Sequence, residues 1–516
     1  MRLYILRLYI LRLYALPYLP KKVIPMKTDR PARRTTQGGW AGRWRAWRAT
    51  HDTGPWLILG ICLLLLPLSV PRVALSDEVQ YYAYLRSVYF DHDLDFRNEY
   101  TYFAEQGRRF GDEAVANALL RADANNPHPQ TGLLRNVAPV GAAIMWAPGF
   151  VLADLGVLLA NQFGANLPRD GFARPYIVAT CMMSVFYTLL GLQLTYRLAR
   201  RYTGDFAATT ATLTVFLASP LVFYTYIAMP WAHATGFGLF ALFLHLWAHH
   251  WGRGSERGLG RWLLLGLVGG LMVMTREQLG LLLSIPALEA LGLFWGLGRK
   301  RQWRVATGLL GRYLAFVVAL ALTVTPQLFA YQMLNGQPRP SATVASKLDW
   351  ASPNFFNTLL DPGRGAFLWA PVLALGLLGL GWLARRDRAL ALLLLVGFLA
   401  QTYINGAFGT TWHLRGAFGF RRLIECTPMF VLGLAALVEW LRPRLGSWPL
   451  LALAALLVYW NLGLIAQWTF LRPELRRELI WNDMLTWQFV KVPSQTLGKL
   501  WTLIFDRCRL VTNQNC

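Results

Sequence analysis

The chain has 516 residues, of which 55% are hydrophobic and 15% are charged, whereas a soluble protein of this size carries about 25% charged residues. Apolar segments of spanning length recur from residue 56 to residue 470, so the chain is predicted to be an all-α polytopic membrane protein and not a multidomain soluble one. The net charge of +24 does not indicate a nucleic-acid-binding protein, because the Lys and Arg residues lie in short clusters between apolar segments, as in cytoplasmic loops.

The basic N-terminal region, residues 1–55, is expected to be a cytoplasmic tail. It opens with the five-residue unit Arg2–Leu6, which then recurs twice with one change. This period matches neither helical nor strand periodicity. Residues 1–25 are therefore interpreted as a misassigned start, with Met26 as the first translated residue. A basic amphipathic anchor is the alternative.

About eleven membrane-spanning helices are expected between residues 56 and 470. The first, Trp56–Leu75, is apolar over 20 residues, which is sufficient to cross a bilayer. The basic clusters between later apolar segments are assigned to the cytoplasm by the positive-inside rule. The further expected spans are 176–197, 206–224, 230–250, 262–275, 279–298, 313–334, 366–384, 389–408, 423–441 and 448–470.

The segment 137–163 is apolar enough to be a further span, but counting it would place every later basic cluster outside. Pro139, Pro148 and the polar Asp154 also make a simple span unfavourable. The segment is therefore expected to be an amphipathic or re-entrant helix at the outer face. A twelfth span with a compensating hairpin elsewhere is the alternative.

Within residues 56–470, the segments that join the outer ends of the expected spans face outside in this topology. The C-terminal tail, 471–516, also faces outside. The long first loop, 76–136, contains ten of the 27 acidic residues. The loops at 335–365 and 409–422 carry cationic residues instead. Carboxylates and cations on one face suit a reaction that activates a hydroxyl and stabilises a phosphate leaving group.

Asp77 and Glu78 follow the first span directly and are the predicted catalytic residues. A carboxylate held at the membrane surface is placed to act as general base on a lipid-borne substrate, and Asp77 is assigned this role. The alternative is helix capping, because Ser76 or Asp77 can be an N-cap and acidic residues favour the first turn. The two roles are compatible.

Three residues at the outer ends of later spans are predicted to bind substrate. His233 begins the fourth span beside Pro230, where it either supports an anion or packs at the membrane interface. Arg276 and Glu277 interrupt an otherwise apolar run, and charges inside such a run mark function or a turn. Phosphate or sugar binding and a structural Arg–Glu pair are both open interpretations.

The loop 412–422 places four titratable or cationic residues between aromatic residues and glycines. It lies outside, against the positive-inside bias, so a topological role does not explain its charge. Arg binds phosphate bidentately and glycines allow close approach, so a phosphate site is favoured over contact with anionic lipid headgroups. The predicted substrate-binding residues here are His413, Arg415, Arg421 and Arg422.

Asp91, Asp93 and Asp95 alternate along the first loop and offer the oxygen ligands that Mg or Ca prefers. The run is not an EF-hand loop, because Phe96 replaces the turn glycine and Tyr102 the terminal glutamate. A solvated acidic turn is favoured, so no metal site is predicted. No Walker or Rossmann motif is present in the sequence, and no ATP or NAD cofactor is expected.

Short motifs follow one another along residues 56–470: Asp77-Glu78, Asn126-Pro127-His128-Pro129, Leu198-Ala199-Arg200-Arg201-Tyr202, Ser219-Pro220, Tyr224 and Thr275-Arg276. In this order and topology the chain resembles the GT-C superfamily of integral-membrane glycosyltransferases. Within it, the chain resembles the bacterial relatives of the dolichyl-phosphate-mannose–protein mannosyltransferases and the lipid A aminoarabinose transferases.

The resemblance implies inverting transfer of a sugar from a polyprenyl-phosphate donor, with Asp77 in the position of the catalytic base. The branch suggested here usually lacks a metal, although others use one. The loop 413–422 and the run Asp91–Asp95 are not general features of the superfamily, so no role is transferred to them. The implied partners are the lipid-linked donor, membrane lipids and an unidentified hydroxyl acceptor, without nucleic acid. The expected location is a bacterial inner membrane, with the active face periplasmic or external.

A transporter or flippase of lipid-linked sugars is the alternative function. A transporter is expected to place ionisable residues near the bilayer midplane and often has two related halves. In this sequence the ionisable residues gather at one face and no duplicated half is evident. The glycosyltransferase is therefore favoured.

Overall fold

The computed structural model describes residues 52–109, 127–252 and 254–505. The predictions for residues 1–51, for 110–126 within the first loop, and for 506–516 fall outside this part of the chain. Within it the chain is helical and forms no strand, apart from an isolated bridge between Pro71 and Met229. The predicted all-α fold class is confirmed.

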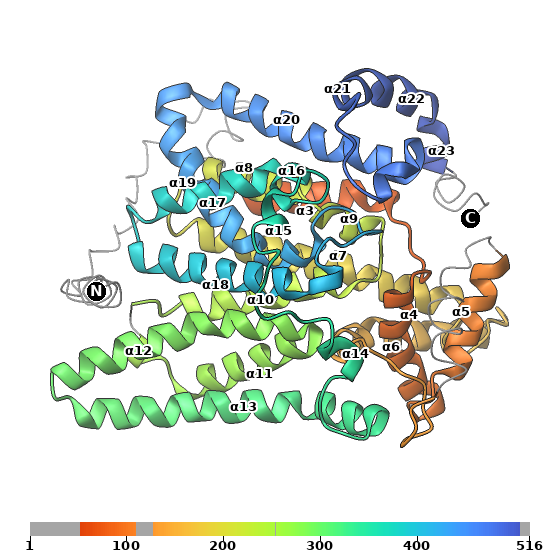
Figure 1. Cartoon of the computed structure of the whole chain (residues 1–516), viewed down its shortest axis with the longest axis horizontal. Coiled ribbons are helices and arrows are strands. Elements are labelled where there is room, and N and C mark those ends of the chain that lie inside the picture. The colour runs from red at the N-terminus through yellow and green to blue at the C-terminus, as the bar shows by residue number, and fades with distance from the viewer. Residues whose placement is uncertain (1–51, 110–126, 253, 506–516) are drawn as a thin grey trace, which may run out of the picture.

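The helices of the N-terminal part are α3 (Gly54–Leu65), η1 (Leu66–Leu68), α4 (Ser76–Arg86), η2 (Ser87–Asp91), α5 (Arg97–Arg109), α6 (Gly141–Gln162) and α7 (Arg174–Ala199) (Figure 1). The central helices are α8 (Asp205–Leu217), α9 (Leu221–Tyr226), α10 (Ala232–Ala248), η4 (Gly254–Glu256), α11 (Leu259–Thr275), η5 (Glu277–Leu283), α12 (Ser284–Arg299) and α13 (Trp303–Asn335). The C-terminal helices are α14 (Ala342–Ala345), α15 (Asn357–Leu360), α16 (Ala366–Trp369), α17 (Pro371–Leu383), α18 (Arg388–Ala407), η6 (Gly409–Thr411), η7 (Arg421–Cys426), α19 (Thr427–Leu445), α20 (Ser447–Ala466), η8 (Gln467–Leu471), η9 (Pro473–Arg476), α21 (Met484–Thr486), η10 (Trp487–Lys491), α22 (Val492–Gly498) and α23 (Leu500–Phe505).

Seven helical segments in the described residues are long and apolar enough to cross a membrane, and five shorter apolar helices accompany them. Each later expected span falls on a helix or a pair of helices, although the span 206–224 is broken at Ser219 and Pro220 into α8 and α9. The first expected span, 56–75, is only partly helical, because α3 and η1 end at Leu68 and residues 69–75 are extended. Large apolar side chains on α13 face outward, with Leu314 56% and Leu322 69% exposed. Water disfavours such a surface but lipid does not, which supports an integral membrane protein.

Glycines allow the closest helix contacts of the bundle. α17 packs against α19 where Gly376 and Gly379 meet Gly433. A Cβ atom added to Gly433 would lie 1.9 Å from the carbonyl oxygen of Gly376, so only glycine fits at this contact. Gly266 and Gly270 of α11 likewise meet the backbone of α13. Small residues four apart let membrane helices approach closely where no hydrophobic driving force acts between them.

The first loop lies at one end of the bundle. α4, α5 and α6 gather at the right in Figure 1, while the turn between α12 and α13 lies at the left. α3 and α7 are antiparallel, because Gln193 of α7 donates to the Pro55 carbonyl and Cys181 contacts the Arg72 carbonyl. The end of α3 and the start of α7 therefore share the end of the bundle at which α4 lies.

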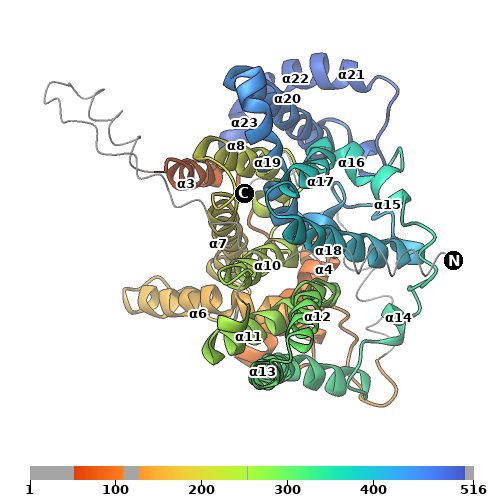
Figure 2. The same ribbon diagram turned by 90° about the vertical axis from the view of Figure 1, so that its left-hand side faces the viewer.

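α6 is long enough to span, but its contacts keep it at this same end. Tyr187 of α7 donates to the Met145 carbonyl, and Tyr176 donates to the Asp154 carboxylate, so α6 lies only along the first half of α7. Its C-terminal part projects from the bundle (Figure 2). The chain therefore enters and leaves α6 at this end of the bundle.

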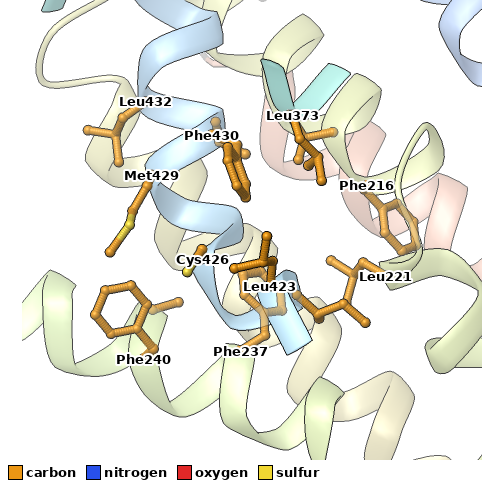
Figure 3. Close-up of a cluster of buried hydrophobic side chains, with 14 of the residues drawn as sticks. Phe216, Leu221, Phe237, Phe240, Leu373, Leu423, Cys426, Met429, Phe430 and Leu432 are labelled. Atoms are coloured by element: carbon orange, nitrogen blue, oxygen red, sulfur yellow. The ribbon is translucent and has the colours of Figure 1, made fainter. Parts of the chain in front are cut away.

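An apolar core lies directly beneath the cationic loop. In Figure 3, Phe237 and Phe240 of α10 pack near Leu423 and Cys426 of η7 and near Met429 of α19. These side chains are all less than 2% exposed. Because η7 begins with Arg421 and Arg422, this packing fixes the backbone from which both arginines extend.

Candidate active site

Glu78, and not Asp77, is the capping carboxylate of α4. Leu75 occupies the N-cap position, and Oε2 of Glu78 accepts the backbone N–H groups of Ala74 and Leu75 at 2.8 and 2.9 Å. A glutamate at the third helical position commonly reaches back in this way. Glu78 therefore has the capping role that was considered for Ser76 and Asp77. The Asp77 side chain is 43% exposed.

Asp77 pairs with an arginine of the cationic loop. Nη2 of Arg421 lies 3.0 Å from Oδ2 of Asp77. The Arg421 guanidinium stacks on the Trp231 ring at 4.0 Å from its centroid, and the Trp231 indole N–H donates to Oε1 of Glu78 at 2.5 Å. The adjacent carboxylates Asp77 and Glu78 are thus joined through Arg421 and Trp231.

A cavity of about 300 Å³ opens beside this ion pair. Asp77 is the only carboxylate among its lining residues. The cationic and titratable side chains around it come from two loops that are distant in the sequence. The lining residues are Asp77, Val344, Lys347, Phe408, Thr411, His413, Leu414, Arg415, Arg421 and Arg422. The excess of positive charge suits a bound anion.

The guanidinium group of Arg422 is only partly hydrogen-bonded within the described residues. It stacks on Phe408 at 4.2 Å from the ring centroid and reaches Thr411 at 3.5 Å. Its Nη1 atom is buried without a hydrogen-bond acceptor. A buried donor left unpaired is costly, and a phosphate oxygen entering the cavity is a suitable partner.

Behind the cavity wall lies a buried network of His233, Arg276 and Glu425. Oε1 of Glu425 is 3.0 Å from Nδ1 of His233 and 3.0 Å from Nε of Arg276. Nη1 of Arg276 lies 3.1 Å from Nε2 of His233. Because an arginine N–H can only donate, Nε2 accepts and Nδ1 carries the proton. Each member of the network therefore orients the other two.

Glu277 is directed away from its neighbour. Its carboxylate accepts the hydroxyl of Tyr331 on α13, whereas Arg276 pairs with Glu425. The backbone at Arg276 is extended, with φ −155° and ψ 113°, between α11 and η5. Adjacent side chains of an extended segment point to opposite sides, so Arg276 and Glu277 do not pair.

Glu78 and His413 are two of the groups near the cavity whose pKa values are shifted. Burial raises the pKa of Glu78 to about 7, although the amide and indole N–H groups that it accepts oppose the shift. Burial also lowers the pKa of His413, and the nearby Arg415, Arg364 and Arg422 lower it further. His413 is therefore neutral at pH 7, and the positive charge of the cavity comes from its Lys and Arg residues.

The acidic run of the first loop is engaged in local bonds. Asp91 pairs with Arg86, Asp93 accepts the Ser87 hydroxyl at 2.7 Å, and Asp95 lies 3.3 Å from Arg97. No group of three or more His, Cys, Asp or Glu side chains in the described ranges has a metal-binding arrangement.

Comparison with known proteins finds similarity at the level of fold. No protein-family model and no curated protein matches the chain. ArnT from Cupriavidus metallidurans bound to undecaprenyl phosphate is 17% identical, with a TM-score of 0.48 over 89% of this chain and 73% of the other. The apo state of ArnT is 16% identical, with a TM-score of 0.46 over 91% and 73%.

The structure brings most of the predicted site residues together. Asp77, His413, Arg415, Arg421 and Arg422 line the cavity. Glu78 connects to the site through Trp231, and His233, whose ring stacks on that of Trp231 at 5.9 Å between centroids, lies beside it and bonds to Arg276. Glu277 alone bonds to α13, away from the cavity.

Lys347, Trp231 and Glu425 belong to the site but were not among the predicted residues. Lys347 was recognised only as a loop cation, yet it lines the cavity. Trp231 was one of 22 Trp residues, without a distinguishing pattern. Glu425 stands near the start of an expected apolar span, and an intramembrane carboxylate is the signal by which it was recognisable.

Proposed function

We propose that this protein is a membrane glycosyltransferase that moves a sugar from a polyprenyl-phosphate donor to a hydroxyl acceptor. The observation that carries the proposal is one cavity in which a single carboxylate, Asp77, faces Lys347, Arg415 and Arg422. A base and a set of phosphate-binding cations are the two requirements of this reaction. We further propose that the membrane is a bacterial inner membrane and that the site faces the periplasm.

Asp77 is suited to be the general base. Its side chain is 43% exposed, while its Oδ2 atom is held by Arg421. A carboxylate fixed at one oxygen leaves the other free to receive a proton from an acceptor hydroxyl. Arg421 is itself fixed by its stacking on Trp231, so the base is pre-positioned before substrate arrives.

Transfer then proceeds in one displacement. The acceptor oxygen forms a bond to C1 of the sugar from the face opposite the phosphate, and the C1–O bond to the phosphate breaks. The hydroxyl proton passes to Asp77, and the polyprenyl phosphate leaves with the electron pair of the broken bond. Lys347, Arg415 and Arg422 stabilise the negative charge that develops on this phosphate. The configuration at C1 is inverted.

The test is the Asp77→Asn variant assayed with a polyprenyl-phosphate sugar. Asn keeps the size of Asp77 but is not a base at neutral pH, so transfer is expected to fall by about 100-fold or more. Asp95→Asn is the matched control, because Asp95 lies in the same loop, outside the cavity, and its carboxylate bonds to the side chain and the backbone N–H of Arg97.

Both variants are compared with the wild type by size-exclusion profile and thermal unfolding in detergent. Wild-type transfer by a folded Asp77→Asn protein would refute the catalytic role of Asp77. Translocation of the lipid-linked sugar across vesicles without any transfer would instead identify a flippase.

A further inference from the structure

The guanidinium group of Arg364 is buried and, in the part of the chain that the structure describes, donates hydrogen bonds to backbone carbonyls only. Arg364 lies between α15 and α16, is 4% exposed, and forms no ion pair within the described ranges. Burial lowers its pKa to about 10. Burying a guanidinium group is unfavourable unless its hydrogen bonds are made. The bonds that Arg364 makes therefore indicate its role.

Those bonds join two segments that are far apart in the sequence. Nη1 of Arg364 donates to the Ala417 carbonyl at 3.2 Å, and Nη2 donates to the Arg476 carbonyl at 2.6 Å. The same Arg476 carbonyl accepts the N–H of Gly416 at 3.1 Å. The N–H of Leu479 in turn donates to the Gly363 carbonyl at 2.9 Å.

The loop that receives these bonds carries part of the cavity wall. Leu414 and Arg415 line the cavity and immediately precede Gly416. Leu414 has φ +50° and Gly416 has φ +81°. A branched side chain such as that of Leu414 is disfavoured in this left-handed region. The loop therefore depends on outside bonds to keep its conformation.

We infer that Arg364 and the C-terminal segment 476–479 form a clamp that positions Arg415 at the cavity. Arg364 does not line the cavity, so it is a positioning residue that acts through the loop 414–417. The proposal rests on the proposed function only in taking the cavity to bind the phosphate of the donor. It gives the segment 476–479, which follows α20, a role in the site through the loop 414–417.

The first measurement is the binding of farnesyl phosphate, a short soluble prenyl phosphate, to purified full-length variants. Arg364→Gln and Arg415→Gln are each expected to weaken binding about tenfold. The double variant is expected to bind no more weakly than Arg415→Gln alone, because Arg364 acts through Arg415. Arg477→Gln is the control, since Arg477 is an exposed arginine of the same segment. Additive losses in the double variant, or unchanged binding in a folded Arg364→Gln protein, would overturn the proposal.

The second measurement is amide hydrogen exchange, which does not require the proposed function to be correct. Arg364→Lys keeps the charge but cannot reproduce both bonds of the guanidinium. It also serves if Arg364→Gln does not fold. Peptides that contain Gly416 and Leu479 are expected to exchange faster in Arg364→Lys than in the wild type, whereas those of α10 stay unchanged. Equal exchange would refute the clamp, whereas failure of wild-type protein to bind farnesyl phosphate would count against the proposed function instead.

Discussion

Asp77 and Arg421 are 344 residues apart in the chain, yet Oδ2 of Asp77 and Nη2 of Arg421 lie 3.0 Å apart. Arg421 also stacks on Trp231, whose indole N–H donates to Glu78. Because Glu78 caps α4 through the backbone of residues 74 and 75, the start of α4 and the start of η7 are locked together. The proposed base and the cations of the cavity are therefore held in one rigid arrangement.

Substitution of Arg421 tests whether this arrangement matters for the chemical step. Lys keeps the charge but loses the planar group that both pairs with Asp77 and stacks on Trp231. Arg421→Lys is expected to lower kcat about tenfold with little change in KM, because small misplacements of a catalytic group are costly. Steady-state kinetics with the lipid-linked donor checks this. Arg97→Lys, at an arginine side chain that is 59% exposed, is the control, and wild-type kcat in Arg421→Lys would contradict the prediction.

The network of Glu425, Arg276 and His233 is expected to stabilise the fold. Glu425→Gln keeps an acceptor for His233 but leaves Arg276 without a negative partner. Breaking a buried ion pair typically costs about 3 to 5 kcal/mol, so the unfolding temperature in detergent should fall clearly. Glu439→Gln, on the same stretch of helix but 30% exposed and 4.0 Å from its partner, should change little.

A double variant tests whether Glu425 and Arg276 interact. Removing both charges, in Arg276→Met/Glu425→Gln, is expected to restore part of the lost stability, because neither charge is then left buried alone. A double variant that shows the summed losses of the two single variants would argue against an interaction between these residues.

The sequence predicted the helices and the end of the bundle at which the acidic and cationic loops meet. Both follow from local properties, since apolar stretches define spans and basic clusters define their orientation. The interruption of the span 206–224 at Ser219 and Pro220 was not predicted, because hydropathy alone does not distinguish one long helix from two short ones.

The pairing of side chains within the site was not predictable. Glu78 and Trp231 are separated by 153 residues, and His233 and Glu425 by 192. No local pattern connects such positions. The opposite directions of Arg276 and Glu277 depend on an extended backbone at Arg276, which the sequence, read as the tip of a hairpin, did not specify.

The stability of the protein is expected to depend on pH through the protonation of Glu78. Burial raises its pKa from 4.5 to about 7, so between these values the folded protein binds a proton that the unfolded chain has lost. The contribution of Glu78 to stability is therefore largest below pH 4.5 and falls by about 3 kcal/mol as the pH rises to about 7. Glu78→Gln removes the titration while retaining an acceptor.

Unfolding temperatures of wild type and Glu78→Gln, measured from pH 5 to pH 8, check this dependence. The variant should gain stability relative to the wild type as the pH rises. Glu99, whose pKa burial also raises to about 7, is present in both proteins and cancels in the comparison. A difference that does not change with pH would contradict the assigned environment of Glu78.

The contact between α17 and α19 should tolerate no side chain at Gly433. An added Cβ would lie 1.9 Å from the carbonyl oxygen of Gly376, whereas a Cβ at Gly381, also on α17, has no atom within 4 Å. Both changes to Ala favour helix formation by up to about 1 kcal/mol. Gly433→Ala must in addition move the two backbones apart, at a cost of about 1 to 3 kcal/mol or more. Unfolding temperatures should therefore fall for Gly433→Ala and stay equal or rise for Gly381→Ala.

The same contact should affect transfer activity, because α19 continues from η7, which carries Arg421 and Glu425. Transfer activity should fall only in Gly433→Ala. Equal behaviour of the two variants would contradict the close packing of α17 and α19.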